Sequence, residues 1–266
     1  MSASPVMNVM VKAARRAGRA LVRDFGEVEQ LQISKKGPAD FVTAADLKAE
    51  KTLKEDLSKA RPGYGFLMEE GGEEVGTDKS HRWIVDPIDG TTNFVHGLAQ
   101  FAISIALERD GQLVAGVVYN PITDEMFTAE KGKGAYLNDQ RRLRVSARTS
   151  LEESLIATGI PFKGKPGFDQ FARELDAMMP LVAGIRRFGS AALDLAFVAA
   201  GRFDGFWERD LKPWDMAAGI VLVREAGGIV QDLDGQSEML TKGTILAAAG
   251  GLTRPLGAVL SGLSKE

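Results

Sequence analysis

The pattern of apolar residues changes near residue 147, and this change limits the folds open to the chain. Before it, helical spacing over 6–25 and 43–60 is followed by short apolar strands and, from 101 to 136, by alternating strands. Asp-Gly at 110–111 lies between two of these strands and is typical of a hairpin turn. The first part of the chain therefore predicts helices packed on an antiparallel sheet.

Beyond residue 147, predicted helices alternate with short strands. No linker-like stretch separates the two patterns, so we expect one compact unit with a half over 1–147 and an α/β half over 148–266. The helices of the second half are expected at 167–180, 190–200, 214–226 and 253–264.

The second helical pattern also predicts which residues face the core. Leu47, Leu53 and Leu57 are expected to point inward, whereas Glu50 and Lys54 are expected outside as an i,i+4 pair.

Composition removes several classes of chemistry. The 266 residues include no cysteine, which excludes thiolate catalysis, zinc–thiolate sites and Fe–S clusters. The two histidines are too few for a multi-histidine metal site. The net charge of −3 gives no reason to expect a nucleic-acid partner. Since neither a signal peptide nor an apolar run long enough for a bilayer is seen, we expect a cytoplasmic protein without a membrane partner.

Two aspartates leave a hydrophobic strand at "WIVDPIDGTTNF". Pro87 holds Asp86 and Asp89 on one tight turn, where the Ile88 carbonyl can face the same way. Two carboxylates held this close repel each other unless a cation compensates. Oxygen ligands without histidine or cysteine suit Mg²⁺, Mn²⁺ or Ca²⁺.

Further acidic residues stand at the ends of predicted elements, and each has an ordinary structural alternative. Asp46 completes a capping box with Thr43, Asp215 can simply favour the start of its helix, and Glu69 can be solvated loop charge. Taken together, these carboxylates need a cation.

The residues after Asp89 predict an anion site. Gly90-Thr91-Thr92 is expected to open a short helix whose free N–H groups bind phosphate oxygens. Two metal ions beside such a cradle are the usual apparatus for displacement at phosphorus by water.

Long motifs in the chain resemble those of the inositol monophosphatase family of Mg²⁺-dependent, lithium-sensitive phosphatases, and the chain resembles a bacterial member. "DPIDGTTNFVHG" (86–97) and "WDMAAGIVLVREAGG" (214–228) look like its two signatures. "KKGPADFVTAAD" (35–46), "FLMEE" (66–70) and "RRFGSAALDLAFVAAGRFDGFWE" (186–208) fit the same family in the same order. The resemblance covers essentially the whole chain.

The resemblance implies an αβαβα five-layer sandwich of the sugar-phosphatase type, a homodimer, and two or three Mg²⁺ ions per active site, with Mn²⁺ possible. The half over 1–147 would carry the main metal site, and the half over 148–266 would close the active site. Lys35 aligns with a mobile-loop lysine near the weaker metal site.

Residue roles also follow from the resemblance. Glu69, Thr91 and Asp46 match the residues that orient the attacking water. The metal ligands would be Glu69, Asp86, the Ile88 carbonyl, Asp89 and Asp215. The substrate would contact Asp89, Gly90, Thr91, Gly189, Ser190, Ala191, Glu208 and Asp215.

One departure concerns the substrate wall. Arg209 and Asp210 stand where many members have an apolar residue and then glycine. Arg209 can either attract a second anionic group or be a solvent-facing loop charge.

The sequence thus predicts a Mg²⁺-dependent phosphomonoesterase that hydrolyses myo-inositol 1-phosphate with metal-activated water. A related alternative is a fructose-1,6-bisphosphatase or a 3′(2′),5′-bisphosphate nucleotidase. A non-enzymatic alternative is a protein-binding regulatory partner with a residual phosphatase site. For that alternative the basic stretch 140–145 is the candidate surface, although a solvated hairpin edge also explains it.

Overall fold

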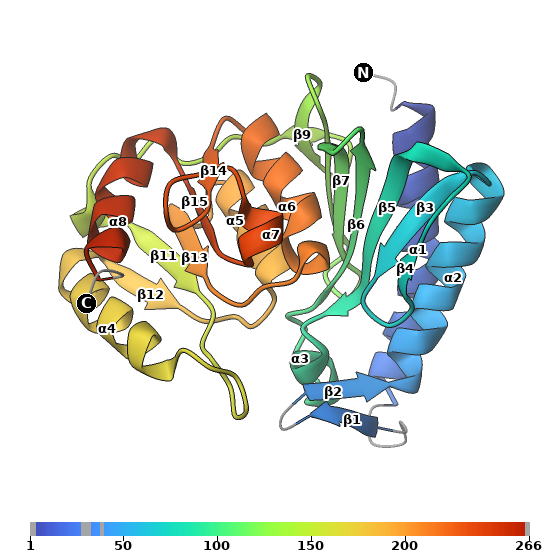
Figure 1. Ribbon diagram of the computed structural model, residues 1–266, viewed down its shortest axis with the longest axis horizontal. Helices are drawn as coiled ribbons and strands as arrows, with labels where there is room; N and C mark the ends of the chain where they lie inside the picture. Colours follow the sequence, from blue (N-terminus) through green and yellow to red (C-terminus); the bar gives the residue numbers. More distant parts are fainter. Residues whose placement is uncertain (1–3, 28–32, 38–39, 264–266) are drawn as a thin grey trace.

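The computed structural model describes residues 4–27, 33–37 and 40–263, with the backbone alone for 33–37 and 40–42. Strands β1 (Ile33–Gly37) and β2 (Asp40–Thr43) form a small antiparallel pair. Two larger sheets and three layers of helices make up the rest of the molecule (Figure 1).

Two long helices form the outer layer at the amino-terminal side, as the periodicity predicted. In α1 (Pro5–Phe25), the Ser4 side chain accepts a hydrogen bond from the Met7 N–H, and proline stands at the first turn. In α2 (Ala44–Ala60), Thr43 and Asp46 form the predicted capping box. Both helices pack on one face of the larger sheet (Figure 1).

The predicted inner face of α2 is wrong in two places. Leu47 is 56% exposed, whereas Glu50 is buried and accepts a hydrogen bond from the Glu70 N–H at 2.8 Å. At 100° per residue, Leu47 lies about 120° around the helix from Leu53, while Glu50 lies on the side of Leu53 and Leu57, which are fully buried. Glu50 is buried because a backbone donor pairs with its charge.

The larger sheet has eight strands in the order β10-β9-β8-β7-β6-β5-β3-β4. All neighbours are antiparallel except β3 and β5, which run parallel with Leu67 opposite Ile84. The bounds are β3 (Tyr64–Met68), β4 (Gly72–Glu74), β5 (Asp78–Asp89), β6 (Ala102–Arg109), β7 (Gln112–Asn120), β8 (Glu125–Glu130), β9 (Gly134–Leu137) and β10 (Arg141–Arg142).

The second sheet has five strands in the order β12-β11-β13-β15-β14. The pairs β11/β12 and β11/β13 are parallel, and the two pairs that involve β15 are antiparallel. The bounds are β11 (Leu155–Thr158), β12 (Gly184–Arg186), β13 (Gly205–Glu208), β14 (Ile229–Gln231) and β15 (Ile245–Ala248). Strand β15 and the short helix α7 (Met239–Lys242) were not predicted from the sequence.

The remaining helices complete the layers. Between the sheets lie α5 (Ala191–Ala199) and α6 (Pro213–Glu225), and outside the second sheet lie α4 (Phe168–Met178) and α8 (Gly250–Gly262) (Figure 1). The expected αβαβα five-layer sandwich is therefore confirmed. Short helices also occur as α3 (Thr91–Val95) and as 3₁₀ turns at Leu151–Glu153 and Met179–Leu181.

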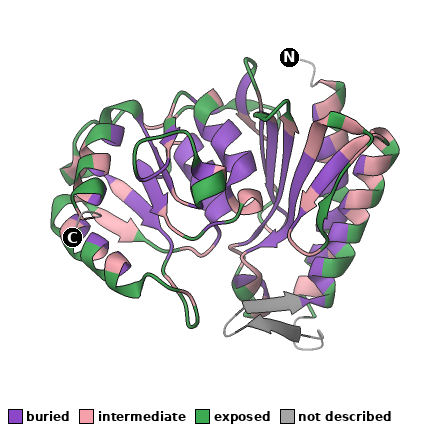
Figure 2. Ribbon diagram, in the orientation of Figure 1, coloured by how far each residue is buried: buried purple, intermediate pink, exposed green. Residues whose placement is uncertain are grey.

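The middle helical layer is buried on both faces. All nine residues of α5 are buried, and α6 is buried from Met216 to Val223 (Figure 2). Both helices are apolar nearly all around, which suits a helix that contacts a sheet on either side. Among the described residues, no helix is long and apolar enough to cross a membrane.

The division at residue 147 stays a prediction. The larger sheet ends at Arg142 and the second sheet begins at Leu155, but one apolar core contains residues from both sheets and from α5 and α6.

Close packing of β7 on α6 gives a stability prediction. A Cβ atom at Gly116 would lie 2.6 Å from the carbonyl oxygen of Ala218, so Gly116→Ala is expected to lower the free energy of unfolding by about 1–3 kcal/mol. Urea unfolding followed by circular dichroism would measure this change. The control is Gly262→Ala, because no atom lies within 4 Å of a Cβ there; equal losses in both variants would contradict the packing argument.

Candidate active site

Three carboxylates converge where β5 ends and α6 begins. Asp86, Asp89 and Asp215 each place an oxygen so that the three oxygens lie within 4.8 Å of one another. The first two aspartates are at the end of one strand, β5, and the third is 126 positions further along the chain from Asp89. The predicted convergence of these residues is therefore present in the structure.

Asp86 is held in a turn of its own backbone. Its Oδ1 accepts a hydrogen bond from the Ile88 N–H at 2.9 Å, across Pro87. Burial raises the pKa of Asp86 well above its usual range, and the charges of Glu69 and Asp89 raise it further.

Asp89 joins the strand end to the start of α5. Its Oδ2 accepts hydrogen bonds from the Ser190 hydroxyl at 2.6 Å and from the Ala192 N–H at 2.7 Å. Burial raises the pKa of Asp89 to about 6, although these two donors act in the opposite direction. Ser190 is itself buried, so its hydroxyl serves Asp89.

Asp215 lies at the start of α6 and also belongs to the acidic cluster. Its Oδ2 accepts the Lys212 N–H at 2.7 Å, which is the expected contact at a helix start. Its carboxylate also belongs to the cluster with Asp86 and Asp89. Burial, followed by the charge of Asp89, raises the pKa of Asp215 to about 8.

Glu69 borders the same cluster from the end of β3. It lines the cavity, its backbone N–H donates to the Val85 carbonyl at 3.2 Å, and its side chain hydrogen-bonds to Asp86. Glu69 is thus part of the acidic group, and the alternative of solvated loop charge does not describe it.

Asp46 and Thr91 are brought together from α2 and α3. The Thr91 hydroxyl lies 3.2 Å from Oδ1 of Asp46 and 3.1 Å from the Ile88 carbonyl, and its single hydrogen can serve one of them at a time. The other carboxylate oxygen of Asp46 accepts the Thr43 N–H at 2.8 Å. Asp46 therefore caps α2 and also contacts Thr91.

Gly90 supplies the turn into α3. Its φ of +99° is a conformation that glycine adopts without strain, and a Cβ atom there would lie 3.0 Å from the Gln100 carbonyl and 3.1 Å from the Gly189 carbonyl. Gly90, Thr91 and Thr92 line the cavity at the first turn of α3, where N–H groups lack intrahelical acceptors.

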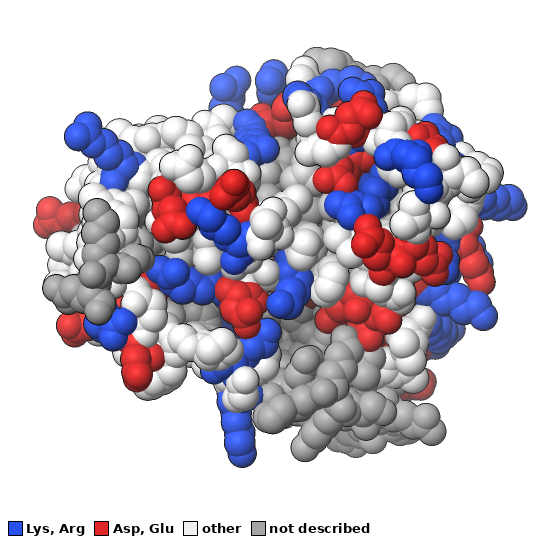
Figure 3. All heavy atoms as spheres, viewed as in Figure 1, with Lys and Arg blue, Asp and Glu red and all other residues white. Residues whose placement is uncertain are grey.

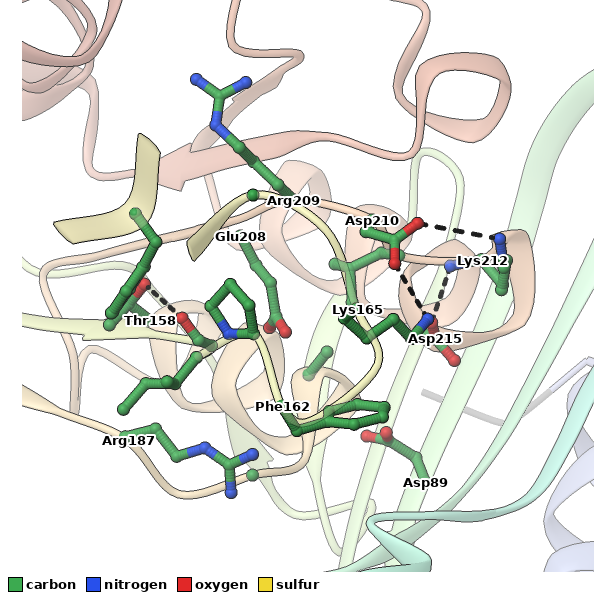
Figure 4. Close-up of a pocket in the computed structure, with 18 of the residues that line it drawn as sticks. Asp89, Thr158, Phe162, Lys165, Arg187, Glu208, Arg209, Asp210, Lys212 and Asp215 are labelled. Carbon is green, nitrogen blue, oxygen red and sulfur yellow. Dashed lines mark hydrogen bonds and ion pairs between the residues drawn. The ribbon is translucent and has the colours of Figure 1, made fainter. Parts of the chain in front are cut away.

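A cavity of about 380 Å³ lies over these residues. On its far side, Glu208 leaves the end of β13 and fits against Gly159, where a Cβ atom would lie 1.8 Å from its Oε1 (Figure 4). Burial and the charges of Asp215 and Asp89 raise the pKa of Glu208 to about 8. Gly189 and Ala191 line the same cavity, whereas its lining does not include Asp46, Asp86, Ile88 or Ser190.

Arg209 is among the residues that line the cavity, and its partly exposed guanidinium is paired with a buried acid. Its Nε and Nη2 donate to Oε1 of Glu174 on α4 at 2.7 Å and 2.6 Å. Figure 4 shows Arg209 pointing away from Asp89 and Asp215.

Asp210 adopts a left-handed backbone conformation that is more usual for glycine. Its φ is +60°, in the left-handed region that aspartate tolerates better than most residues. Its carboxylate pairs with Lys165 at 2.9 Å and lies 3.9 Å from Lys212.

Several lining residues were missed by the sequence analysis. Phe162 and Lys165 come from the loop that follows β11, and Arg187 follows β12 (Figure 4). The sequence feature that could have indicated them is the Gly-, Pro- and Lys-rich stretch after Thr158, because loops at the carboxyl ends of strands in α/β folds build binding sites.

Asp194, which the sequence analysis also missed, is a buried acid on α5. Burial and the charge of Glu208 raise its pKa well above the usual range.

The position of Lys35 and the distribution of surface charge can each be described in part. Lys35 lies on β1, but its side chain is outside the described residues. On the face shown in Figure 3, the described acidic and basic side chains are intermingled over the surface.

The donor set fits a hard divalent cation. The carboxylates of Asp86, Asp89 and Asp215 offer only oxygen. Burial raises the pKa of all three, and the charges of neighbouring carboxylates raise the pKa values of Asp86 and Asp215 further. A cation held between them would favour their ionised forms.

Comparison with known proteins gives consistent matches over the whole chain. Residues 2–262 match the profile described as "Inositol monophosphatase family". The chain is 60% identical to an inositol-1-monophosphatase of Rhizobium meliloti, over 92% of each chain, and 46% identical to the Nus factor SuhB of Pseudomonas aeruginosa, over 91% of each. The crystal structure of the extragenic suppressor protein suhB from Bartonella henselae superposes with a TM-score of 0.94 at 60% identity, covering 97% of this chain and 98% of that one.

The raised pKa values predict how metal and pH act on stability. Asp89, Asp215 and Glu208 have folded-state pKa values of about 6 to 8, above the value of about 4 in an unfolded chain, so the folded state holds more protons between pH 4 and 8. In EDTA, the melting temperature is therefore expected to fall by about 5 °C or more from pH 5 to pH 8. Added Mg²⁺ should raise it more at pH 8 than at pH 5.

Thermal unfolding at each pH, with EDTA and with Mg²⁺, measures both effects. The lowered pKa values of Asp78 and Asp232 act below about pH 4 and do not enter this window. Asp215→Asn should flatten the pH dependence, whereas the exposed control Asp110→Asn should leave it unchanged. A melting temperature that rises with pH in EDTA would contradict the raised pKa values of the clustered acids.

Proposed function

Because this chain belongs to the inositol monophosphatase family, we propose that it hydrolyses myo-inositol 1-phosphate to inositol and phosphate with Mg²⁺ as cofactor. Relatives about 60% identical are named inositol-1-monophosphatase, and the chain is accordingly a phosphomonoesterase by type. One observation carries the proposal: three carboxylates from β5 and α6 converge on one side of a cavity, and a further carboxylate, Glu208, faces them across it.

The metal ligands follow from the positions of the acidic groups. Two or three Mg²⁺ ions, with Mn²⁺ as a substitute, would neutralise charge on the phosphate and make water a better nucleophile. Inhibition by lithium would follow from the weaker of these sites. The ligands proposed are Glu69, Asp86, the Ile88 carbonyl, Asp89 and Asp215.

The attacking water would be oriented by three residues of this chain. Thr91 presents its hydroxyl between Asp46 and the Ile88 carbonyl. When that hydroxyl donates to Asp46, its lone pairs can accept a hydrogen from water, and Glu69 can accept the other. Asp46 can hold this arrangement because Thr43 fixes its second oxygen.

The phosphate and the alcohol would bind on opposite sides of the cavity. The N–H groups of Gly90 and Thr91 would donate to phosphate oxygens at the first turn of α3. Glu208 would accept hydrogen bonds from hydroxyl groups of the alcohol. The remaining contacts proposed are Asp89, Gly189, Ser190, Ala191 and Asp215.

The pairing of Arg209 favours a monophosphate over a bisphosphate. Arg209 is the residue that the sequence suggested for binding a second phosphate. Because Glu174 neutralises its guanidinium, Arg209 is already paired within the protein. Fructose 1,6-bisphosphate and adenosine 3′,5′-bisphosphate are therefore expected to be poorer substrates.

The binding-partner alternative keeps one surface candidate. Residues 141–142 form β10 at the edge of the larger sheet, where both arginines are exposed, as a solvated hairpin edge predicts. Because none of the acidic residues of the candidate site is replaced by a neutral one, an active phosphatase is favoured over a binding partner with a residual phosphatase site.

Phosphate release from a panel of esters tests the proposed function. The panel holds myo-inositol 1-phosphate, glycerol 2-phosphate, fructose 1,6-bisphosphate and adenosine 3′,5′-bisphosphate, each with Mg²⁺, with EDTA and with Li⁺. Asp89→Asn should lower kcat/KM by more than about 100-fold, since even residues behind metal ligands are worth about 10- to 100-fold. Asp110→Asn, in an exposed hairpin turn, is the matched control.

Two results would overturn this function. No release from any ester by folded, Mg²⁺-supplied protein would move the binding-partner alternative to the front. Release that persists in EDTA would remove the metal from the mechanism.

We also propose that the enzyme is a homodimer, in keeping with its family. Support comes from large apolar side chains exposed along residues 168–181, because exposed apolar surface commonly marks association surfaces. Sedimentation equilibrium is expected to give twice the chain mass of 28.6 kDa. A single-chain mass at micromolar concentration would reject the dimer. The exposed side chains are Phe168, Met179 and Leu181.

A further inference from the structure

Glu208 stands between two residues whose side chains point the other way. Successive side chains of a strand alternate between its faces, so Trp207 and Arg209 share one side of β13 and Glu208 takes the opposite side. Figure 4 shows Glu208 and Arg209 leaving the end of this strand in opposite directions, with Glu208 on the side of Asp89 and Asp215, although both residues line the cavity.

A single buried carboxylate holds both neighbours of Glu208. Oε1 of Glu174 accepts from Nε and Nη2 of Arg209 at 2.7 Å and 2.6 Å, and Oε2 accepts from Nε1 of Trp207 at 3.2 Å. Gln170, one turn earlier on α4, donates to Oε1 at 2.9 Å. Glu174 therefore links α4 to the two strand positions on either side of Glu208.

The burial of Glu174 makes this link rigid. Its side chain is 1% exposed, and a carboxylate with so little access to water requires charged and hydrogen-bonding partners in fixed positions. Arg209 supplies the charge, while its guanidinium remains 30% exposed. Removing the carboxylate would release Arg209 toward solvent and loosen the end of β13.

The carboxylate of Glu208 has little freedom where it lies against Gly159. It lies against Gly159, where even a Cβ atom would overlap it at 1.8 Å. Its position is thus set by the slot at Gly159 on one side and by the anchored neighbours Trp207 and Arg209 on the other.

We propose that Glu174 is a positioning residue that sets the orientation of Glu208 toward the hydroxyl groups of the leaving alcohol. This inference rests on the proposed function of the same cavity. It makes Glu174 a determinant of substrate class: polyol phosphates depend on it, and esters whose alcohol carries no further hydroxyl group do not.

Kinetics on two esters tests the proposal. Glu174→Gln is expected to raise KM for myo-inositol 1-phosphate by about 10-fold, the factor that one well-placed hydrogen bond is worth. The ratio of kcat/KM between this ester and 4-nitrophenyl phosphate should fall by a similar factor. Asp176→Asn, an exposed acid on the same helix, should leave the ratio unchanged.

A double-mutant cycle separates positioning from a general structural role. Once Glu208→Gln has removed the carboxylate that contacts the alcohol, adding Glu174→Gln should change the ratio no further. Arg209→Gln should reproduce the effect of Glu174→Gln, and the pair combined should be no worse than either alone. Equal losses on both esters, or a full effect in the Glu208→Gln background, would overturn the proposal.

A crystal structure of the Glu174→Gln variant gives a test that does not need activity. Displacement of the Glu208 side chain from Gly159 would support the proposal, and an unchanged Glu208 would overturn it. Failure of the wild type to hydrolyse any ester would reject the proposed function, while this structure would still decide the role of Glu174.

Discussion

Repulsion among carboxylates at the end of β5 is the constraint on which the rest of the structure depends. Three acidic side chains lie within 4.8 Å of one another, in partly or wholly buried positions that favour their neutral forms. Each is held by a backbone N–H group: that of Ile88 for Asp86, of Ala192 for Asp89, and of Lys212 for Asp215. These donors restrain the acids even before any cation is bound.

The middle helical layer brings these parts to one place. Because α5 and α6 lie between the sheets, their amino-terminal ends meet the end of β5, and the second sheet adds Glu208 across the cavity (Figure 1). The acidic groups of the candidate site are thus divided among three layers. Packing of the apolar faces sets their distances more closely than any loop could do alone.

Local patterns in the sequence predicted most of the fold and the acidic half of the site. Periodicity was sufficient for α1, α2 and most strands, and the motif around Asp86 and Asp89 indicated a metal site through the chemistry of its side chains. Long-range partners were not predictable in this way. Glu50 was expected in solvent because nothing nearby in sequence shows the Glu70 N–H, and Arg209 gave no sign that a carboxylate 35 positions earlier would bind it. Tertiary contacts decided both cases.

The left-handed backbone at Asp210 has a consequence for how this enzyme can diverge. Glycine, asparagine and aspartate all adopt a φ near +60° at a cost of about 1–2 kcal/mol or less, so they can replace one another there without moving the chain. Only aspartate, however, forms the ion pair with Lys165 in the loop after β11. Single-codon changes at this position could therefore alter the charge and closure of the cavity rim during evolution while leaving the metal site untouched.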